Sequence, residues 1–160
     1  HAPDPNYTIE ASLRPAKEAV AAGTIRFVGV SNFSVDEIKR ARDVVDVVSV
    51  QNQYNPWQRQ PETDGVLEYC ENEGLTFLPG SPLGGSRRVA SLPDIAAIAQ
   101  LAKAKGVSVY AIVLAWLQAK SPCVVPIPGA SKASSIEDSV KAAQIQLSSD
   151  EVRQIDRATG

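Results

Sequence analysis

The chain has 160 residues, of which 44% are hydrophobic and 21% are charged, and its formal net charge is −2. This length and composition predict one globular domain with a buried core. The nearly balanced charge offers no basic surface to nucleic acid, and no apolar stretch reaches the ~20 residues that a bilayer requires. We therefore expect a small-molecule ligand, and no nucleic-acid or membrane partner.

The first third of the chain is predicted to alternate helix and strand. Residues 10–22 carry apolar side chains at helical spacing and precede Gly23, a residue typical of helix ends. Residues 24–30 are β-branched and apolar with little alternation, which favours a strand buried on both faces. Ser34 and Glu37 have the spacing of a capping box, so a helix is expected to begin after Ser34.

The middle of the chain continues this alternation. Residues 47–51 and 75–78 have the composition of buried strands, and residues 63–72 are predicted to form a helix that ends before Gly74. Residues 79–92 hold three glycines and are predicted to form an irregular surface loop. Loops of that length in compact domains are often functional.

The last third is predicted to hold one strand and several helices. Pro93 and Gly106 mark the start and the end of one helix, and Ser108 is expected to cap another that ends at Ala119. Residues 124–127 are predicted to form a fourth strand. The last two helices are expected to begin at capping pairs, Ser134 with Glu137 and Ser148 with Glu151.

Strand–helix units joined by short connections predict the α/β class with a parallel sheet. Four such units fit either a doubly wound sheet or half of a (β/α)₈ barrel, and periodicity does not separate the two. A full barrel needs about 250 residues and eight strands, more than this chain holds.

The ends and the cysteines give further expectations. The chain begins at His1 and contains no Met, which indicates a sequence that starts within a longer gene. Its first residues lack the pattern of a secretory signal, which favours a cytoplasmic location. Cys70 and Cys123 lie far apart among apolar neighbours, so both are expected to be free thiols.

Polar residues follow the first two predicted strands, at the end where active sites of parallel α/β folds gather. Ser31 and Asn32 follow the first strand, and Gln51 and Asn52 lie at the end of the second. Turn formation and capping explain Ser31 and Asn32 as well as ligand binding does. Gln51 needs a partner at a buried strand end, which favours a binding role.

Two later segments have the composition of anion sites. The glycines of residues 81–85 free the backbone to present N–H donors. Residues 128–132 combine small side chains with Lys132 just before a predicted helix, which is typical of a phosphate site. Each segment is also consistent with a solvated loop.

Four motifs in this order together resemble the aldo-keto reductase family: residues 25–33 (IRFVGVSNF), 51–55 (QNQYN), 81–85 (SPLGG) and 127–132 (IPGASK). The opening HAPDP resembles the segment after that family's fourth barrel strand. The resemblance therefore covers essentially the whole chain. It implies that residues 1–160 are a single partial domain, the C-terminal half of a (β/α)₈ TIM barrel.

The resemblance implies an NADP-dependent oxidoreductase that reduces aldehydes and ketones to alcohols by hydride transfer. In such enzymes a tyrosine protonates the carbonyl oxygen, assisted by a lysine, an aspartate and a histidine. His1 matches the histidine and is the catalytic residue that the resemblance assigns. The other three belong to the earlier half of the barrel, so the 160-residue chain alone is expected to be inactive.

The resemblance also assigns the cofactor NADP to named residues. Ser31, Asn32 and Gln51 would hold the nicotinamide carboxamide, while Ser81 and Leu83 would meet the pyrophosphate. Lys132 would face the adenosine phosphate, and the other cofactor-binding residues implied are Gly85, Gly129, Ser131 and Asp138. The chain departs from the family's usual residues at Gly80, Ser135 and Ser139.

A second hypothesis, from a different class, is a half barrel that binds a nucleotide or a protein without catalysis. A bare half barrel exposes two strand edges and an apolar inner face, so it predicts self-association. Neither hypothesis involves a metal site. The enzyme hypothesis predicts a small carbonyl substrate.

Overall fold

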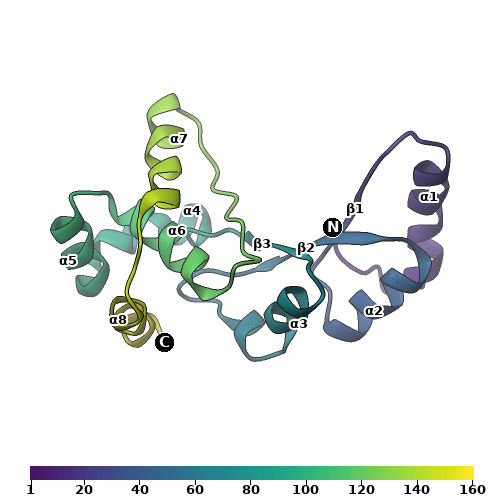
Figure 1. Ribbon diagram of the computed structural model, residues 1–160, viewed down its shortest axis with the longest axis horizontal. Helices are drawn as coiled ribbons and strands as arrows, with labels where there is room; N and C mark the ends of the chain where they lie inside the picture. Colours follow the sequence, from purple (N-terminus) through teal and green to yellow (C-terminus); the bar gives the residue numbers. More distant parts are fainter. The chain divides into compact units, whose positions relative to one another are not determined.

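The computed structural model describes all 160 residues, which divide into two compact units. Unit 1 comprises residues 1–52 and 60–78, and unit 2 comprises residues 53–59 and 79–160 (Figure 1). The single domain expected from the sequence stays a prediction. No single helix is long and apolar enough to span a membrane. The helices Ala96–Lys105 and Val109–Lys120 reach that length and apolar character only when taken together, and the two are bent by 99° relative to each other.

The chain's one sheet has three strands in the order β1-β2-β3. The strands of this sheet and the helices of unit 1 are, in chain order, α1 (Ile9–Ala21), β1 (Val28–Ser31), α2 (Val35–Val44), β2 (Val47–Gln53), η1 (Gln60–Glu62), α3 (Val66–Asn72) and β3 (Thr76–Gly80). β1 and β2 run parallel, with Ser31 opposite Gln51. The ends of these strands therefore lie side by side, as the sequence predicted.

Apolar residues of these strands and helices form the core of unit 1. Val47, Val50 and Phe77 on the strands, and Ile38 and Ala41 on α2, have at most 1% of their surface exposed. The capping box predicted at Ser34 is confirmed, since the Glu37 carboxylate accepts a hydrogen bond from the Ser34 N–H at 2.8 Å. This cap fixes where the chain leaves β1 and enters α2.

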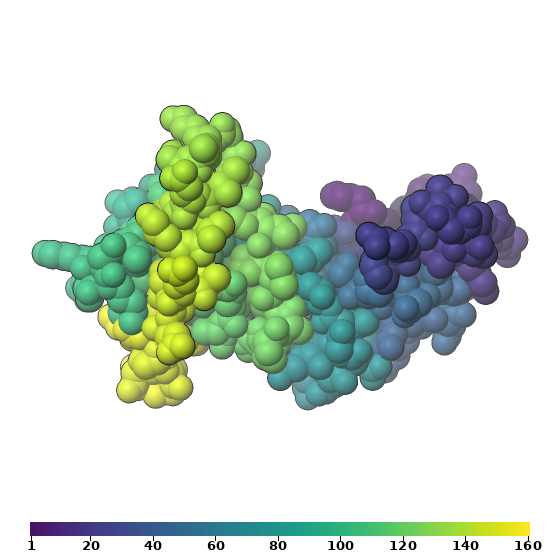
Figure 2. Space-filling model, turned by 45° about the horizontal axis from the view of Figure 1, so that its top comes forward, coloured from purple at the N-terminus to yellow at the C-terminus, as the bar shows by residue number.

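Unit 2 is mainly helical. Its elements are α4 (Gly85–Arg88), η2 (Val89–Asp94), α5 (Ala96–Lys105), α6 (Val109–Lys120), α7 (Ala133–Val140), η3 (Lys141–Gln144) and α8 (Ser149–Thr159). α6 is its central helix, because all seven residues 111–117 are buried. In Figure 2 the yellow atoms, which belong to the last part of the chain, run from the upper to the lower side of this unit.

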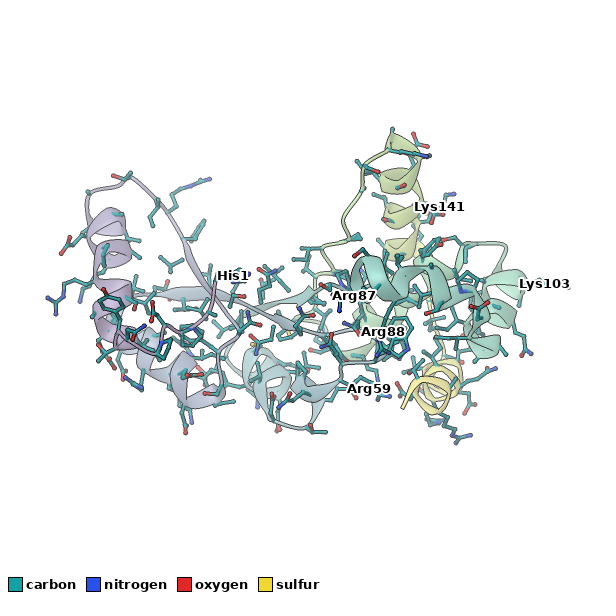
Figure 3. The ribbon with its side chains drawn as sticks, turned by 180° about the vertical axis from the view of Figure 1, so that it is seen from behind. His1, Arg59, Arg87, Arg88, Lys103 and Lys141 are labelled. Carbon is teal, nitrogen blue, oxygen red and sulfur yellow. The ribbon has the colours of Figure 1, made fainter.

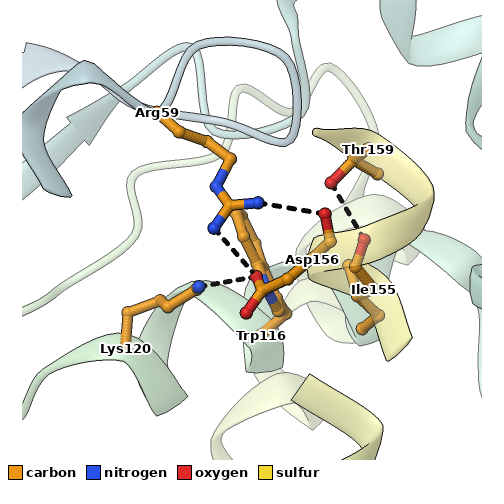
Figure 4. A network of polar contacts seen from close by, with 6 residues as sticks. All are labelled: Arg59, Trp116, Lys120, Ile155, Asp156 and Thr159. Carbon is orange, nitrogen blue, oxygen red and sulfur yellow. Dashed lines mark hydrogen bonds and ion pairs between the residues drawn. The ribbon is translucent and has the colours of Figure 1, made fainter. Parts of the chain in front are cut away.

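A polar network fastens α8 to the rest of unit 2 (Figure 4). One oxygen of Asp156 accepts hydrogen bonds from Trp116 Nε1 at 2.9 Å and Lys120 Nζ at 2.6 Å, and Arg59 lies 3.2 Å from it. The Trp116 ring in turn packs 5.9 Å from the ring of buried Tyr54. α8 is thus tied to α6 and to residues 53–59.

Three of the four predicted strands are confirmed, with shifted ends. The first begins at Val28 rather than at residue 24. The N–H groups of Thr24 and Ile25 both donate to the carbonyl of Ala19, at 2.9 and 3.4 Å, so these residues close α1 instead. A tertiary closing turn overrides the β-branched composition there.

The fourth strand, expected at residues 124–127, is wrong, because these residues form no strand in the structure. Pro126 and Pro128 carry no N–H and cannot donate to a ladder, which excludes them from a strand interior. Val125 and Ile127 are 50% and 41% exposed. The sheet consequently ends at β3.

Several predicted helix boundaries are also wrong. Ser134 does not cap a helix, since α7 already begins at Ala133 and no side chain caps it. Pro93 lies inside η2, and α5 begins only at Ala96. Residues 79–92 are not one irregular loop, because the end of β3, α4 and most of η2 occupy them.

Other local predictions are confirmed. Gly106 ends α5 with φ at 67°, in the left-handed region that favours glycine. The hydroxyls of Ser108 and Ser148 accept hydrogen bonds from first-turn N–H groups of α6 and α8. Cys70 and Cys123 form no disulfide bond.

Candidate functional site

Ser31, Asn32 and Gln51 meet at the carboxyl ends of β1 and β2. The Ser31 hydroxyl donates to the backbone carbonyl of Gln51 at 2.9 Å, and the Asn32 N–H donates to the same oxygen at 3.0 Å. The structure thus brings together the three residues predicted to hold a carboxamide. We call them the strand-end cluster.

Asn32 also holds the first residue of the chain. Its backbone takes a φ of 57°, a left-handed conformation that Asn tolerates better than most residues. Its side-chain Nδ2 donates to the carbonyl of His1 at 3.0 Å and to the Ser31 hydroxyl at 3.3 Å. The predicted catalytic residue is therefore tethered to the strand-end cluster through its backbone, and its imidazole takes no part in the tether.

The side-chain amide of Gln51 has no hydrogen-bond partner within the chain. The residue is half-buried, and no buried side-chain nitrogen or oxygen in the structure lacks a partner. The free amide of Gln51 is consequently open to solvent. It is the one side-chain amide of the strand-end cluster that can pair fully with a ligand.

Asn52, which the sequence analysis grouped with Gln51, has a structural role. Its Oδ1 accepts from the N–H of Phe33 at 3.2 Å, and its Nδ2 donates to the carbonyl of Phe33 at 2.8 Å. Both ends of this amide are occupied by the turn that follows β1, which leaves Gln51 as the binding candidate on β2.

The glycine-rich segment 81–85, in unit 2, has an unusual backbone. Ser81, Gly84 and Gly85 have φ values of 50°, 83° and 69°. At Gly84 a Cβ atom would lie 2.4 Å from Cζ3 of Trp57, so the indole packs directly on this glycine. The Arg88 guanidinium lies 5.3 Å from the centre of the Trp57 ring. Trp57 and Arg88 therefore hold the segment in place.

Two arginines of α4 are adjacent to this segment. Figure 3 labels Arg87 and Arg88 side by side on the short helix. The Arg88 guanidinium packs on the ring of Trp57, whereas Arg87 is exposed and makes no ion pair.

A cleft of about 420 Å³ opens in unit 2. It is lined by Leu83, Val89, Ser108, Tyr110, Gly129, Ser134, Ser135, Asp138 and Ser139. Three predicted cofactor residues, Leu83, Gly129 and Asp138, thus lie together. Sequence reasoning did not point to Tyr110, because the position of a residue on a helix shows no link to segments that are distant in sequence.

The other predicted residues of unit 2 do not line this cleft. They are Ser81, Gly85, Ser131 and Lys132. Ser131 and Lys132 are exposed, and Lys132 stands at the N-terminal end of α7. The expectation that Ser31, Asn32, Gln51, Ser81 and Lys132 surround one cleft stays a prediction, since they belong to two units.

The chain is similar to known proteins in both sequence and structure. The family model described as the aldo/keto reductase family matches residues 1–159. An uncharacterized oxidoreductase of Schizosaccharomyces pombe is 42% identical over 136 residues, which cover 84% of this chain and 42% of that protein.

Two solved structures are also similar. A thermostable aldo-keto reductase in complex with the inhibitor epalrestat has 36% identity and a TM-score of 0.86, over 99% of this chain and 57% of that one. An aldo-keto reductase from Klebsiella pneumoniae in complex with NADPH has 27% identity and a TM-score of 0.88, over 99% and 56%. The chain therefore spans about half the length of the relatives it matches.

Proposed function

Since this chain belongs to the aldo-keto reductase family, we propose that it forms part of an NADP-dependent oxidoreductase that reduces aldehydes or ketones to alcohols. The family match and the solved structures confirm the α/β class and a partial (β/α)₈ barrel, which removes the doubly wound alternative.

The observation that carries the proposal is the solvent-open amide of Gln51 beside Ser31 and Asn32. An amide side chain offers both a donor and an acceptor, which match the two groups of a carboxamide. The Ser31 hydroxyl and the Asn32 N–H fix the backbone carbonyl of Gln51, so its side chain starts from a defined position. The strand-end cluster is suited to hold a nicotinamide carboxamide.

The residues of unit 2 fit the rest of a dinucleotide. The first-turn N–H groups of α7 donate no hydrogen bond to a capping side chain, and Lys132 lies directly before them. Such a helix end, with a lysine, favours a phosphate. At Gly85 a Cβ would meet only the Ser81 hydroxyl, at 3.9 Å, so this backbone is open to a ligand. Ser81, Leu83, Gly85, Gly129, Ser131, Lys132 and Asp138 would hold the phosphates and the adenosine.

When bound, a reduced nicotinamide cofactor supplies a hydride to a carbonyl carbon. On this chain His1 would donate a hydrogen bond to the carbonyl oxygen from the position at which Asn32 holds its backbone. None of the tyrosines is placed as a proton donor by the motifs. Tyr54 is fully buried, and the Tyr69 hydroxyl accepts a hydrogen bond from Arg42 at 3.0 Å. The 160-residue chain alone is therefore proposed to be inactive.

The test is a titration of the chain with NADPH, followed by cofactor fluorescence, beside an NADPH oxidation assay with an activated aldehyde. We expect weak binding and no enzymatic turnover. The variant Gln51→Ala should weaken binding, whereas Gln53→Ala, an exposed residue of the same strand, should leave it unchanged. Equal binding by the wild type and both variants, or robust turnover that His1→Ala abolishes, would contradict the proposal.

A further inference from the structure

The cleft of unit 2 is built by three segments that are distant in sequence. Leu83 and Val89 come from the segment after β3, Ser108 and Tyr110 from the start of α6, and the rest from residues 129–139. Its volume of about 420 Å³ lies within the usual range for small-ligand pockets, roughly 300–1,000 Å³. This is space for a nucleoside.

The lining of the cleft has an apolar part and a polar part. Leu83, Val89 and the ring of Tyr110 form the first, and serine hydroxyls with the Asp138 carboxylate form the second. A planar nitrogen heterocycle has two apolar faces and a rim of hydrogen-bonding groups, so it matches both parts at once. An aliphatic or purely polar ligand would match only one.

Asp138 is held in a defined position at the polar part. Its carboxylate accepts a hydrogen bond from the Ser108 hydroxyl, and Lys141 Nζ lies 3.7 Å from its Oδ1. Ser108 is itself fixed, because its Oγ accepts from the N–H of Ala111 at 3.0 Å as the cap of α6. A carboxylate has about four lone-pair sites, so it retains the capacity to accept from a ligand amine.

Tyr110 is the largest side chain that lines the cleft, two residues after the cap that fixes Asp138. It is half-buried, and its hydroxyl has no partner within the chain. The residues contributed by α7 include three serines, which offer little surface to a planar ring. Tyr110 is therefore the side chain with the area needed to cover one face of a base.

We propose that Tyr110 stacks on the adenine of the dinucleotide, when that base lies in the cleft beside Asp138. The inference rests on the proposed function, because the adenine is the far end of the proposed cofactor. It adds an aromatic binding residue from α6 to a site that the motifs assign to glycine-rich and helix-end segments alone.

The test measures binding of adenosine 2′,5′-bisphosphate to the full chain by isothermal titration calorimetry. Stacking of a base on an aromatic ring is worth about 1–3 kcal/mol. Since the cleft is open, we take the lower part of that range and expect Tyr110→Leu and Tyr110→Ala to bind roughly 5- to 30-fold more weakly. Tyr110→Phe keeps the ring and should bind within about twofold of the wild type. Inorganic pyrophosphate should bind all variants equally.

Circular dichroism establishes that each variant is folded, and Tyr110→Leu keeps apolar bulk in case Tyr110→Ala is not. Wild-type affinity in Tyr110→Leu would overturn the inference. If Gln51→Ala still weakened NADPH binding in that case, the proposed function would stand. Loss of bisphosphate binding in Tyr110→Leu, with no effect of Gln51→Ala on NADPH, would support Tyr110 and contradict the nicotinamide assignment. No binding of either nucleotide to the wild type would overturn both.

Discussion

The side chain of Asn32 donates a hydrogen bond to the backbone carbonyl of His1 at 3.0 Å, across 31 positions of sequence. The bond depends on a residue that combines an amide with tolerance of a φ of 57°. Position 32 thus serves both the turn after β1 and the placement of the first residue.

Two variants separate these roles of Asn32. Asn32→Gly loses the amide but suits the left-handed backbone, whereas Asn32→Ala loses the amide and adds strain of about 1–2 kcal/mol. A net hydrogen bond contributes about 0.5–1.5 kcal/mol. Urea denaturation should therefore rank the variants wild type, then Gly, then Ala. Equal stability of the Gly and Ala variants would show that the backbone at position 32 is not left-handed.

The network around Asp156 predicts a large loss of stability on Asp156→Asn. The neutral side chain weakens three charge-assisted interactions, with Trp116, Lys120 and Arg59, in a partly buried place. Removing one partner from such a group costs on the order of 2–4 kcal/mol. Asp150→Asn on the same helix is the matched control, because the Asp150 side chain is 90% exposed and its pair with Arg153 should contribute less than about 1 kcal/mol. Equal effects in guanidinium denaturation would refute the structural role of the network.

Gly84 and Gly74 make a second matched pair. Both have a left-handed φ, 83° and 67°, but a Cβ would contact the indole of Trp57 only at Gly84 and would meet nothing within 4 Å at Gly74. Gly74→Ala should therefore cost only strain, about 1–2 kcal/mol. Gly84→Ala adds overpacking of about 1–3 kcal/mol. The double variant Gly84→Ala with Trp57→Ala should recover part of that excess, and strictly additive thermal stabilities would argue against the contact.

The ion pair between α1 and α2 predicts a pH dependence of stability. The Arg40 side chain, 2.9 Å from Glu10, lowers the pKa of Glu10 from 4.5 to about 2. Because the folded-state pKa is lowered, the stabilisation is fully present above pH 4.5 and is lost as the pH falls toward 2. Glu10→Gln should flatten the stability profile in that window. Glu18→Gln on the same helix, which breaks no ion pair, should not. A wild-type profile retained in Glu10→Gln would exclude Glu10 as its source.

Local signals in the sequence predicted much of this fold. The capping pairs Ser34–Glu37 and Ser148–Glu151 act within one helical turn, so their helix starts follow from the residues themselves. The β-branched composition of residues 124–127 predicted a strand that does not form, because Pro126 and Pro128 lack the N–H groups that a ladder needs.

The site was predictable only in part, for a similar reason. Ser31 and Gln51 come together because parallel strands align their ends, which follows from the strand pattern. The approach of Tyr110, Ser108 and Asp138 depends on how α6 packs against α7, and side-chain periodicity within either helix does not record it.

The amide of Asn52 has one further consequence. By accepting from the N–H and donating to the carbonyl of Phe33, it imitates a peptide group of a neighbouring strand just beyond the end of β1. Residue 33 is thereby protected as though the ladder continued, although the backbone has already turned toward α2. Its amide proton should exchange with deuterium at a rate typical of a strand interior, and Asn52→Ala should raise that rate to one typical of a surface turn.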